Sequence, residues 1–277
     1  MQTVLDILPS EVLTEICLLV GDKVKLRSVC KALRAKVDAE LVTHIKCQSV
    51  PTRHVLARFQ RLASMRLTAR NYKRLGNLTM LRQLDIEVVH IDAITPRAGL
   101  TALRRLTALQ HLNMSNNILP RRTGLDLISR LTALRHLEMR DVYVPDLTPL
   151  SCLTALQHLD MFGNSTVSDL SPLALLTALR NLDLYGNRLA DVHHISQLVG
   201  LTHLSLAANN LSSDDITSLS SLTVLASLDI WDNGLADIGP LAALATLECL
   251  DIRMNDGVRC GSGFLVLACA LIQPIHG

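Results

Sequence analysis

Aromatic residues are scarce in this chain of 277 residues. Phe, Tyr and Trp together make up 3% of it, whereas hydrophobic residues make up 49%. A core with few large rings must be filled by aliphatic side chains, so we expect leucine packing to dominate. No uninterrupted apolar run reaches the roughly 18 residues that a membrane span requires, the longest candidate being residues 263–275. The sequence therefore predicts no membrane partner.

Strong charge of either sign is also missing. The formal net charge is +2, and no cluster of Lys and Arg interleaved with aromatics appears. We therefore expect no nucleic acid partner. The sequence contains no glycine-rich phosphate loop, no nucleophile elbow and no HExxH motif. We expect neither catalysis nor a cofactor.

The seven cysteines are odd in number and form no Cys-x-x-Cys pair. Cys17, Cys47 and Cys152 fall at apolar positions of the sequence pattern, so we expect them to be small buried hydrophobes in a reducing compartment. Asp6 and Glu11 interrupt the first apolar residues, and no basic region precedes them. A signal peptide is therefore not expected, and the predicted location is cytoplasmic or nuclear.

Eight copies of the pattern Leu-x-x-Leu-x-(Leu/Met/Ile) dominate what is present. They begin at Leu81, Leu109, Leu134, Leu156, Leu179, Leu201, Leu225 and Leu247, with spacings of 28, 25, 22, 23, 22, 24 and 22 residues. Alternation within each copy sends apolar side chains inward and the residues between them outward, as in a short strand. A regular period in the twenties is the signature of stacked repeats, with one strand per repeat.

Each repeat continues with recurring polar residues. In six copies an Asn follows the last apolar strand residue by three positions: Asn117, Asn164, Asn187, Asn209, Asn233 and Asn255. An amide both donates and accepts, so stacked Asn side chains can satisfy buried loop backbone. Val89 and Val142 occupy this position in the other two copies, and we expect the ladder to be interrupted there. Three copies then contain Asp-apolar-x-Pro-Leu, at 146–150, 169–173 and 237–241, which predicts short 3₁₀ or single-turn helices capped by the Asp.

These motifs resemble the leucine-rich-repeat superfamily, specifically the 22-residue class of internalin-like proteins and a phosphatase-regulating nuclear subunit. The resemblance covers residues 41–256. It implies an α/β fold, a right-handed solenoid with a concave parallel sheet of about ten short strands. Two weaker repeats are expected to precede the regular ones, with Ile45 and Met65 in their strands and a helix over residues 53–62 between them. The fold says little about the ligand, because unrelated binding functions share it.

The first forty residues depart from the repeat. The segment at 7–16, Ile-Leu-Pro-Ser-Glu-Val-Leu-Thr-Glu-Ile, and the apolar stripe of Leu26, Val29 and Leu33 predict a small all-α bundle over residues 1–40. The segment resembles an F-box, although the usual Trp of the third helix is absent. The resemblance implies that Leu8, Pro9, Leu13 and Ile16 bind a Skp-type adaptor, linking the chain to a cullin scaffold of a ubiquitin ligase. The alternative is a helical cap that covers the end of the solenoid without binding a partner.

Outward strand positions form three columns across successive repeats. The first runs Gln83, His111, His136, His158, Asn181, His203, Ser227 and Cys249; the second, Asp85, Asn113, Glu138, Asp160, Asp183, Ser205, Asp229 and Asp251; the third, Glu87, Ser115, Arg140, Phe162, Tyr185, Ala207, Trp231 and Arg253. Three of the seven aromatics of the chain fall in the third column, with Ala207 as a gap. Exposed aromatics and arginines dominate interface energetics. We therefore predict that Arg140, Phe162, Tyr185, Trp231 and Arg253 bind a protein target; the alternative is incidental surface aromatics.

The first two columns also invite an enzymatic or metal interpretation. Adjacent strands lie about 4.8 Å apart, which would bring His136 and His158 near Glu138 and Asp160. Duplication of a repeat produces such columns without any chemistry, and an open sheet has no pocket that excludes water. We expect a hydrated polar face and no metal site.

Residues 257–277 depart from the repeat again. Their apolar run, residues 264–272, predicts a cap over the last repeat, ending before Pro274. An artefactual or truncated end is the alternative. The overall expectation is a substrate-recognition subunit of a cullin-type ubiquitin ligase. The alternative is a ligase-independent scaffold or phosphatase-regulator-like protein.

Overall fold

The computed structural model describes most of the repeat region. It covers the backbone of His44–Cys47 and Ser64–Leu67, and Gly76, residues 78–86 and 101–117, Leu119, residues 125–255 and Val258. The expected bundle at 1–40, the helix at 53–62 and nearly all of the C-terminal segment at 257–277 lie outside the described residues. The four expected adaptor-binding residues, Leu8, Pro9, Leu13 and Ile16, lie outside them as well.

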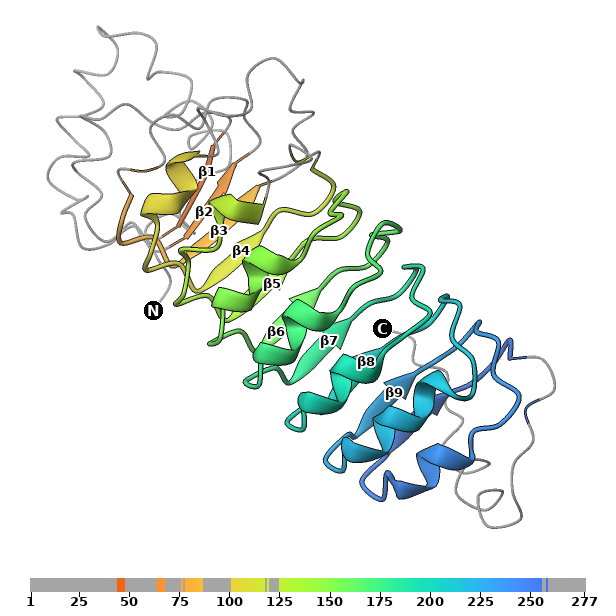
Figure 1. The fold of residues 1–277 in the computed structure, drawn as a ribbon. Coiled ribbons are helices and arrows are strands. Elements are labelled where there is room, and N and C mark those ends of the chain that lie inside the picture. Colours follow the sequence, from red (N-terminus) through yellow and green to blue (C-terminus); the bar gives the residue numbers. More distant parts are fainter. Residues whose placement is uncertain are drawn as a thin grey trace, which may run out of the picture.

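Ten parallel strands form one sheet in the described part of the chain, in the order of the sequence. Figure 1 shows them side by side along an elongated stack. The strands are β1 (His44–Cys47), β2 (Ser64–Leu67), β3 (Gln83–Ile86), β4 (His111–Asn113), β5 (His136–Glu138), β6 (His158–Asp160), β7 (Asn181–Asp183), β8 (His203–Ser205), β9 (Ser227–Asp229) and β10 (Cys249–Asp251). The expected solenoid with about ten strands is confirmed, including the two weaker repeats at its start.

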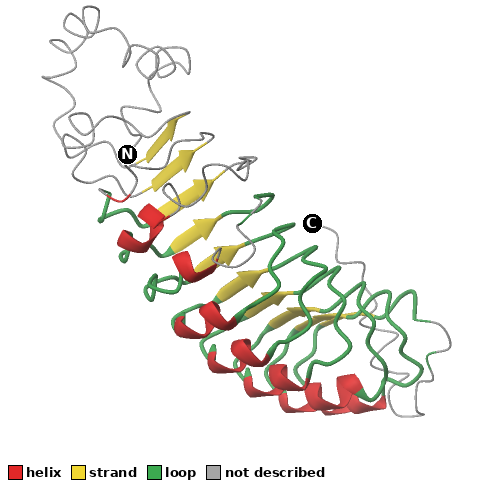
Figure 2. Ribbon diagram, turned by 45° about the horizontal axis from the view of Figure 1, so that its top comes forward, coloured by secondary structure: helices red, strands yellow, loops and turns green. Residues whose placement is uncertain are grey.

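Short 3₁₀ helices line the side of the stack opposite the strands (Figure 2). Those described are η3 (Thr101–Arg105), η4 (Leu125–Leu127), η5 (Thr148–Cys152), η6 (Ser171–Leu175), η7 (His193–Gln197), η8 (Asp215–Ser221) and η9 (Gly239–Ala243). The Asp before η5, η6 and η9 accepts a backbone N–H through Oδ1 at 2.8 Å, as the sequence predicts: Asp146 from Thr148, Asp169 from Ser171 and Asp237 from Gly239. In the described ranges no helix is long and apolar enough to span a membrane.

The leucine pattern fills a single core between the strands and the short helices. In the repeat that contains β6, Leu156 and Met161 are fully buried and Leu159 is 2% exposed. Side chains between these positions point out of the sheet, because successive residues of a strand face opposite sides. The expectation for Cys152 is wrong. Cys152 ends η5 and is exposed, since the inward positions there belong to Leu150 and Leu153.

The asparagine ladder forms as expected. Each of the six Asn Nδ2 groups donates to a carbonyl of its own repeat and to one of the preceding repeat; Asn209 Nδ2, for instance, lies 2.9 Å from the Leu206 oxygen and 3.0 Å from the Leu184 oxygen. Val142 takes the same position in its repeat and is fully buried. An apolar side chain offers no such hydrogen bonds, so the ladder is interrupted there.

Candidate recognition surface

The strand register brings the first two predicted columns together on the sheet. Parallel pairing aligns His111 with His136 and His136 with His158, and it aligns Asn113, Glu138, Asp160 and Asp183 in the same way. Their side chains are partly exposed, whereas the leucines between them are buried. These positions of both columns therefore point outward as expected, whereas Asp251 of the second column, in the last described repeat, is buried at 5% exposure.

At the third column, just beyond the strand ends, backbone hydrogen bonds between neighbouring repeats continue. The Phe162 carbonyl oxygen accepts the Asp141 N–H at 2.8 Å, and the Tyr185 oxygen accepts the Gly163 N–H at 2.8 Å. The carbonyl oxygen of Trp231 accepts the Ala208 N–H at 2.7 Å. The backbone that carries the aromatic rings is thus tied to the neighbouring repeat in the same way as the strands.

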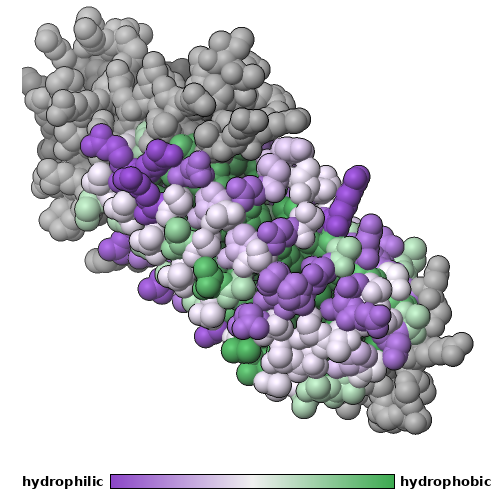
Figure 3. Space-filling view, in the orientation of Figure 1, coloured by the Kyte–Doolittle hydropathy of each residue, from purple (hydrophilic) through white to green (hydrophobic). Residues whose placement is uncertain are grey.

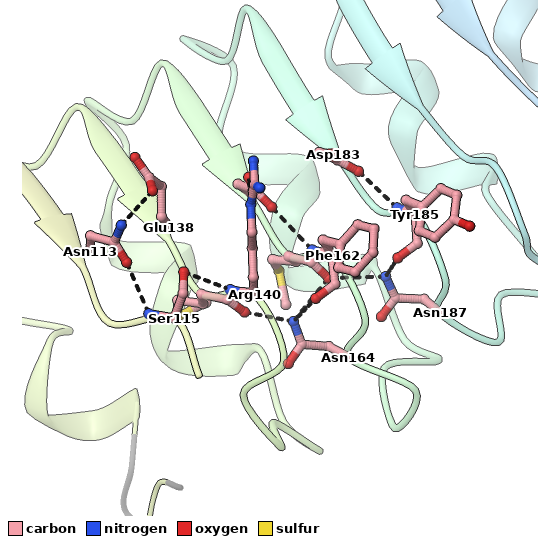
Figure 4. A network of polar contacts seen from close by, with 12 residues as sticks. Asn113, Ser115, Glu138, Arg140, Phe162, Asn164, Asp183, Tyr185 and Asn187 are labelled. Carbon is pink, nitrogen blue, oxygen red and sulfur yellow. Dashed lines mark hydrogen bonds and ion pairs between the residues drawn. The ribbon is translucent and has the colours of Figure 1, made fainter. Parts of the chain in front are cut away.

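The three rings form one row, which we call the aromatic row (Phe162, Tyr185 and Trp231). The ring centroids of Phe162 and Tyr185 lie 4.6 Å apart at an interplanar angle of 2°. Figure 4 shows these two side chains parallel to each other. The Tyr185 and Trp231 centroids lie 6.0 Å apart at 8°, although a whole repeat separates them. Ala207 of that repeat is fully buried, so it is not the exposed gap that the sequence suggested.

Aspartates of the second column hold the turns from which the rings project. The Oδ1 atoms of Asp160, Asp183 and Asp229 accept the backbone N–H two residues later, at 3.1, 2.9 and 3.1 Å. The donors are Phe162, Tyr185 and Trp231. This local carboxylate-to-backbone bond closes a turn and fixes where the next side chain starts. Sequence reasoning missed this role, although the recurring Asp-x-aromatic spacing is the signal for it.

Arginines bracket the aromatic row. Arg140 Nε lies 2.5 Å from Asp160 Oδ2 of the next repeat. Arg253 pairs with Asp251 of its own repeat, with Nε 2.9 Å from Oδ1 and the nearest terminal nitrogen 2.5 Å from Oδ2. The hydrogen bond to the aspartate raises the pKa of each arginine above its usual value. Both guanidinium groups are therefore engaged by the chain itself while remaining about half exposed, at 54% and 48%.

The two inner aspartates differ from the outer pair. Within the described residues neither Asp183 nor Asp229 forms an ion pair, since neither has an arginine in the third column of its own repeat or of the preceding one. Burial raises the pKa of both carboxyl groups, against the opposing effect of the backbone N–H that each accepts. Arg140 lowers the pKa of Asp183 and Arg253 lowers that of Asp229, but burial has the larger effect. Both are therefore partly buried acids that form no direct ion pair among the described residues.

The histidine column stacks on itself. The ring centroids of His111 and His136 lie 5.1 Å apart, and those of His136 and His158 lie 4.1 Å apart. Burial, aided by neighbouring histidines, lowers the pKa of His136 and of His158. One histidine meets a carboxylate of the second column, with His111 Nε2 3.4 Å from Glu138 Oε1. In the described part no group of three or more His, Cys, Asp or Glu side chains is placed to hold a metal ion.

The predicted target-binding residues thus lie on one face, but nothing in this geometry identifies what they bind. Figure 3 shows the view of Figure 1 in space-filling form, with hydrophilic side chains interspersed among apolar ones over the described residues. The row is the part of the sheet face where rings gather and are held in place. It remains the candidate recognition surface.

Similar solved structures are leucine-rich-repeat proteins. Internalin C2 from Listeria monocytogenes is 26% identical, with a TM-score of 0.54 over 59% of this chain and 69% of that one. The chain has the leucine-rich-repeat fold. Internalin InlF from the same organism is 20% identical, with a TM-score of 0.53 over 90% and 86% of the two chains. A plant peptide hormone receptor, RGFR1 in complex with RGF2, is 18% identical, with a TM-score of 0.60 over 82% and 42%.

No protein-family model and no curated protein matches the sequence. The fold and the similar structures indicate a protein–protein interaction module. They carry no sign of an F-box or of a ubiquitin ligase.

Proposed function

We propose that this chain is the target-recognition subunit of a cullin-type ubiquitin ligase. In this proposal the aromatic row and the flanking Arg140 and Arg253 bind a protein target. The N-terminal segment binds a Skp-type adaptor through Leu8, Pro9, Leu13 and Ile16, and the location is cytoplasmic or nuclear. The chain catalyses no reaction itself and acts by holding the target near the ligase.

The aromatic row is the observation that supports target binding. Its rings are large, partly exposed and mounted on backbone that is hydrogen-bonded to neighbouring repeats. Such rigid aromatic anchors lose little conformational entropy on binding and are enriched among interface hot spots. The solved receptor RGFR1 in complex with RGF2 shows that this fold can bind a peptide. The ligase part of the proposal is supported by the Leu8-Pro9 segment and by the order of an F-box-like segment followed by repeats.

Capture of an adaptor tests the ligase part. The full chain should retain a Skp-type adaptor, and replacing Leu8 and Pro9 by Ala should abolish that binding while the circular dichroism spectrum is unchanged. Lys23→Ala, in the same N-terminal segment but outside the four expected adaptor-binding residues, serves as the control and should bind normally. If the unmodified chain retains no such adaptor from its own cell extract, the ligase role is wrong. The ligase-independent scaffold or phosphatase-regulator-like protein then takes its place.

Target binding is tested separately on the sheet face. Proteins captured by the full chain are compared quantitatively with those captured by Trp231→Ala. The matched control is Ser151→Ala, on η5 on the opposite side of the stack. A genuine target should be lost with Trp231→Ala, with binding weakened by at least about 2 kcal/mol, and retained by the control. If every captured protein survives Trp231→Ala, the aromatic row is not the recognition surface.

A further inference from the structure

The space over Ala207 is bounded on two sides by flat rings. Each repeat from β6 to β9 carries a ring in the third column except the one that contains β8, where Ala207 stands. Tyr185 and Trp231 therefore face each other across it, 6.0 Å apart and nearly parallel. A planar group entering between them would extend the row that Phe162 and Tyr185 already form.

The two acids that form no ion pair among the described residues belong to the same turns. Asp183 and Asp229 accept the N–H of Tyr185 and Trp231 respectively, and so lie at the base of each ring. The Ser205 side chain, in the strand between them, is one of the groups that oppose the rise in the pKa of Asp229. A partly buried carboxylate that forms no direct ion pair is costly, because it has lost solvation. Arg140 acts on Asp183 and Arg253 on Asp229 without a direct contact, and neither outweighs the effect of burial on the pKa.

The chain shows what such an acid binds when a cation is available. At one end of the aromatic row Asp160 binds the guanidinium of Arg140, and at the other Asp251 binds that of Arg253. At Asp183 and Asp229 the third-column residues of the same repeat and of the preceding one are not arginines: they are Phe162 and Tyr185 beside Asp183, and Ala207 and Trp231 beside Asp229. A guanidinium supplied by another molecule would complete the same pairing.

We propose that the aromatic row recognises an arginine side chain of the target, with its guanidinium between Tyr185 and Trp231 and beside Asp183 and Asp229. The inference rests on the proposed target binding and names its ligand chemistry. Guanidinium is planar and always charged, stacks on aromatic faces and forms bidentate hydrogen bonds with carboxylates. Lysine has the charge without the plane. An aromatic side chain has the plane but would bury both acids further without neutralising them.

Entry of the guanidinium requires a small adjustment of the rings. Two stacking contacts of about 3.5 Å each need the rings to be about 7 Å apart, whereas the ring centroids of Tyr185 and Trp231 now lie 6.0 Å apart. The backbone of both rings is fixed by the aspartate turns, so the adjustment falls on side-chain torsions of partly exposed residues. The methyl group of Ala207 beneath them leaves room that any larger side chain would fill.

Trp231 is the single tryptophan of the chain, so its fluorescence reports on this site directly. The folded full chain is titrated with acetyl-Ala-Ala-Arg-Ala-Ala-amide and with peptides that carry Lys or Gln at the centre. The arginine peptide should shift the emission with saturation, the lysine peptide should bind about tenfold more weakly, and the glutamine peptide should give no saturable shift. No response to the arginine peptide, or an equal response to all three, overturns the arginine assignment.

The acids are tested by replacing both Asp183 and Asp229 with Asn. An amide oxygen can still accept the turn N–H, as Asn113 does from Ser115 at 3.0 Å in its own repeat, so the rings stay in place. Affinity for the arginine peptide should fall at least about tenfold. Asp169→Asn, next to η6 on the far side, should bind as the parent does. Unchanged affinity in the double variant contradicts the proposal.

Target capture separates this inference from the proposed function. If capture is lost with Trp231→Ala and unchanged with the two Asn replacements, the row recognises a target and the arginine assignment is wrong. If Trp231→Ala still captures the target while the arginine peptide binds as expected, the aromatic row binds arginine. The proposal that this row is the surface that binds the target is then wrong.

Discussion

The shared carbonyl of Leu184 allows a sharp test of the asparagine ladder. Asn187 Nδ2 donates to this oxygen at 2.8 Å from its own repeat, and Asn209 Nδ2 donates to it at 3.0 Å from the next. Either donor alone satisfies the oxygen. Replacing one asparagine therefore has a different consequence from replacing both, and the difference can be measured.

Asn187→Leu should lower the free energy of unfolding by about 1 kcal/mol, at the low end for a lost buried hydrogen bond. Each carbonyl that Asn187 serves keeps another donor: Met161 from Asn164 Nδ2 at 2.9 Å, Leu184 from Asn209 at 3.0 Å and Tyr185 from the Gly163 N–H at 2.8 Å. The replacement also removes the Asn187 Oδ1 atom, which is buried and accepts no hydrogen bond in the described part of the chain. Its loss offsets part of the cost.

Asn209→Leu should cost about 1–3 kcal/mol more than Asn187→Leu. Its donor contacts are shared in the same way, but its Oδ1 also accepts the Leu189 N–H at 3.1 Å. That buried backbone donor loses its acceptor when the amide becomes a leucine. The two single replacements therefore separate the donor half of the ladder from the acceptor half.

The double replacement should lose more than the sum of the two single replacements, by about 1 kcal/mol, because the Leu184 oxygen then loses both donors. Urea unfolding followed by circular dichroism and Trp231 fluorescence measures all three. Asn210→Leu, the same substitution at an exposed neighbour, is the control and should be nearly neutral. Equal losses for the two single variants would contradict the role of Asn209 Oδ1 as acceptor of the Leu189 N–H. Strict additivity in the double variant would refute the shared-carbonyl geometry.

Other perturbations test the turns and the row. Gly186→Ala should cost about 1 kcal/mol because Gly186 has a φ of +64°, and Ala208→Gly, at a φ of +49°, should gain up to about that amount in urea unfolding. Trp231→Ala should destabilise less than Leu228→Ala, a fully buried control on β9 expected to cost about 2–5 kcal/mol. Burial raises the pKa of Asp183 in the folded chain above its value in the unfolded chain. The charged carboxylate therefore destabilises the fold, and this effect grows as the pH rises from the unfolded pKa to the folded pKa and is complete above it. Asp183→Asn should therefore melt higher than the parent at pH 7, and this gain should disappear below the ordinary pKa of 3.8.

The repeat positions could be predicted from the sequence because they repeat. A Leu-x-x-Leu-x-apolar spacing fixes which residues face the core, and stacking aligns equal positions, so His136 had to lie beside His158. The same logic fails where a residue lies outside the strict pattern. The sequence pattern places Cys152 at an apolar position and so predicts burial, but the turn of η5 places Leu150 and Leu153 inward instead.

Side-chain contacts between repeats could not be predicted from the sequence, because they depend on the rotamers of the side chains. Column positions place Arg140 next to Phe162, yet its guanidinium reaches Asp160 of the second column. They also separate Tyr185 from Trp231 by a whole repeat, whereas the rings approach each other over the small side chain of Ala207. No one-dimensional spacing specifies these rotamers.

The turn below each ring does not itself require a negative charge. Asn113 closes the equivalent turn with a neutral amide, and its oxygen accepts the Ser115 N–H as the aspartates do at their own turns. At Asp160 and Asp251 the charge is used, since each binds an arginine of the chain. At Asp183 and Asp229 it opposes folding and has no ion-pair partner among the described residues. Residues that destabilise a fold are often retained because the function requires them. The negative charges of Asp183 and Asp229 lie beside Tyr185 and Trp231, the two rings best placed to hold a planar cation.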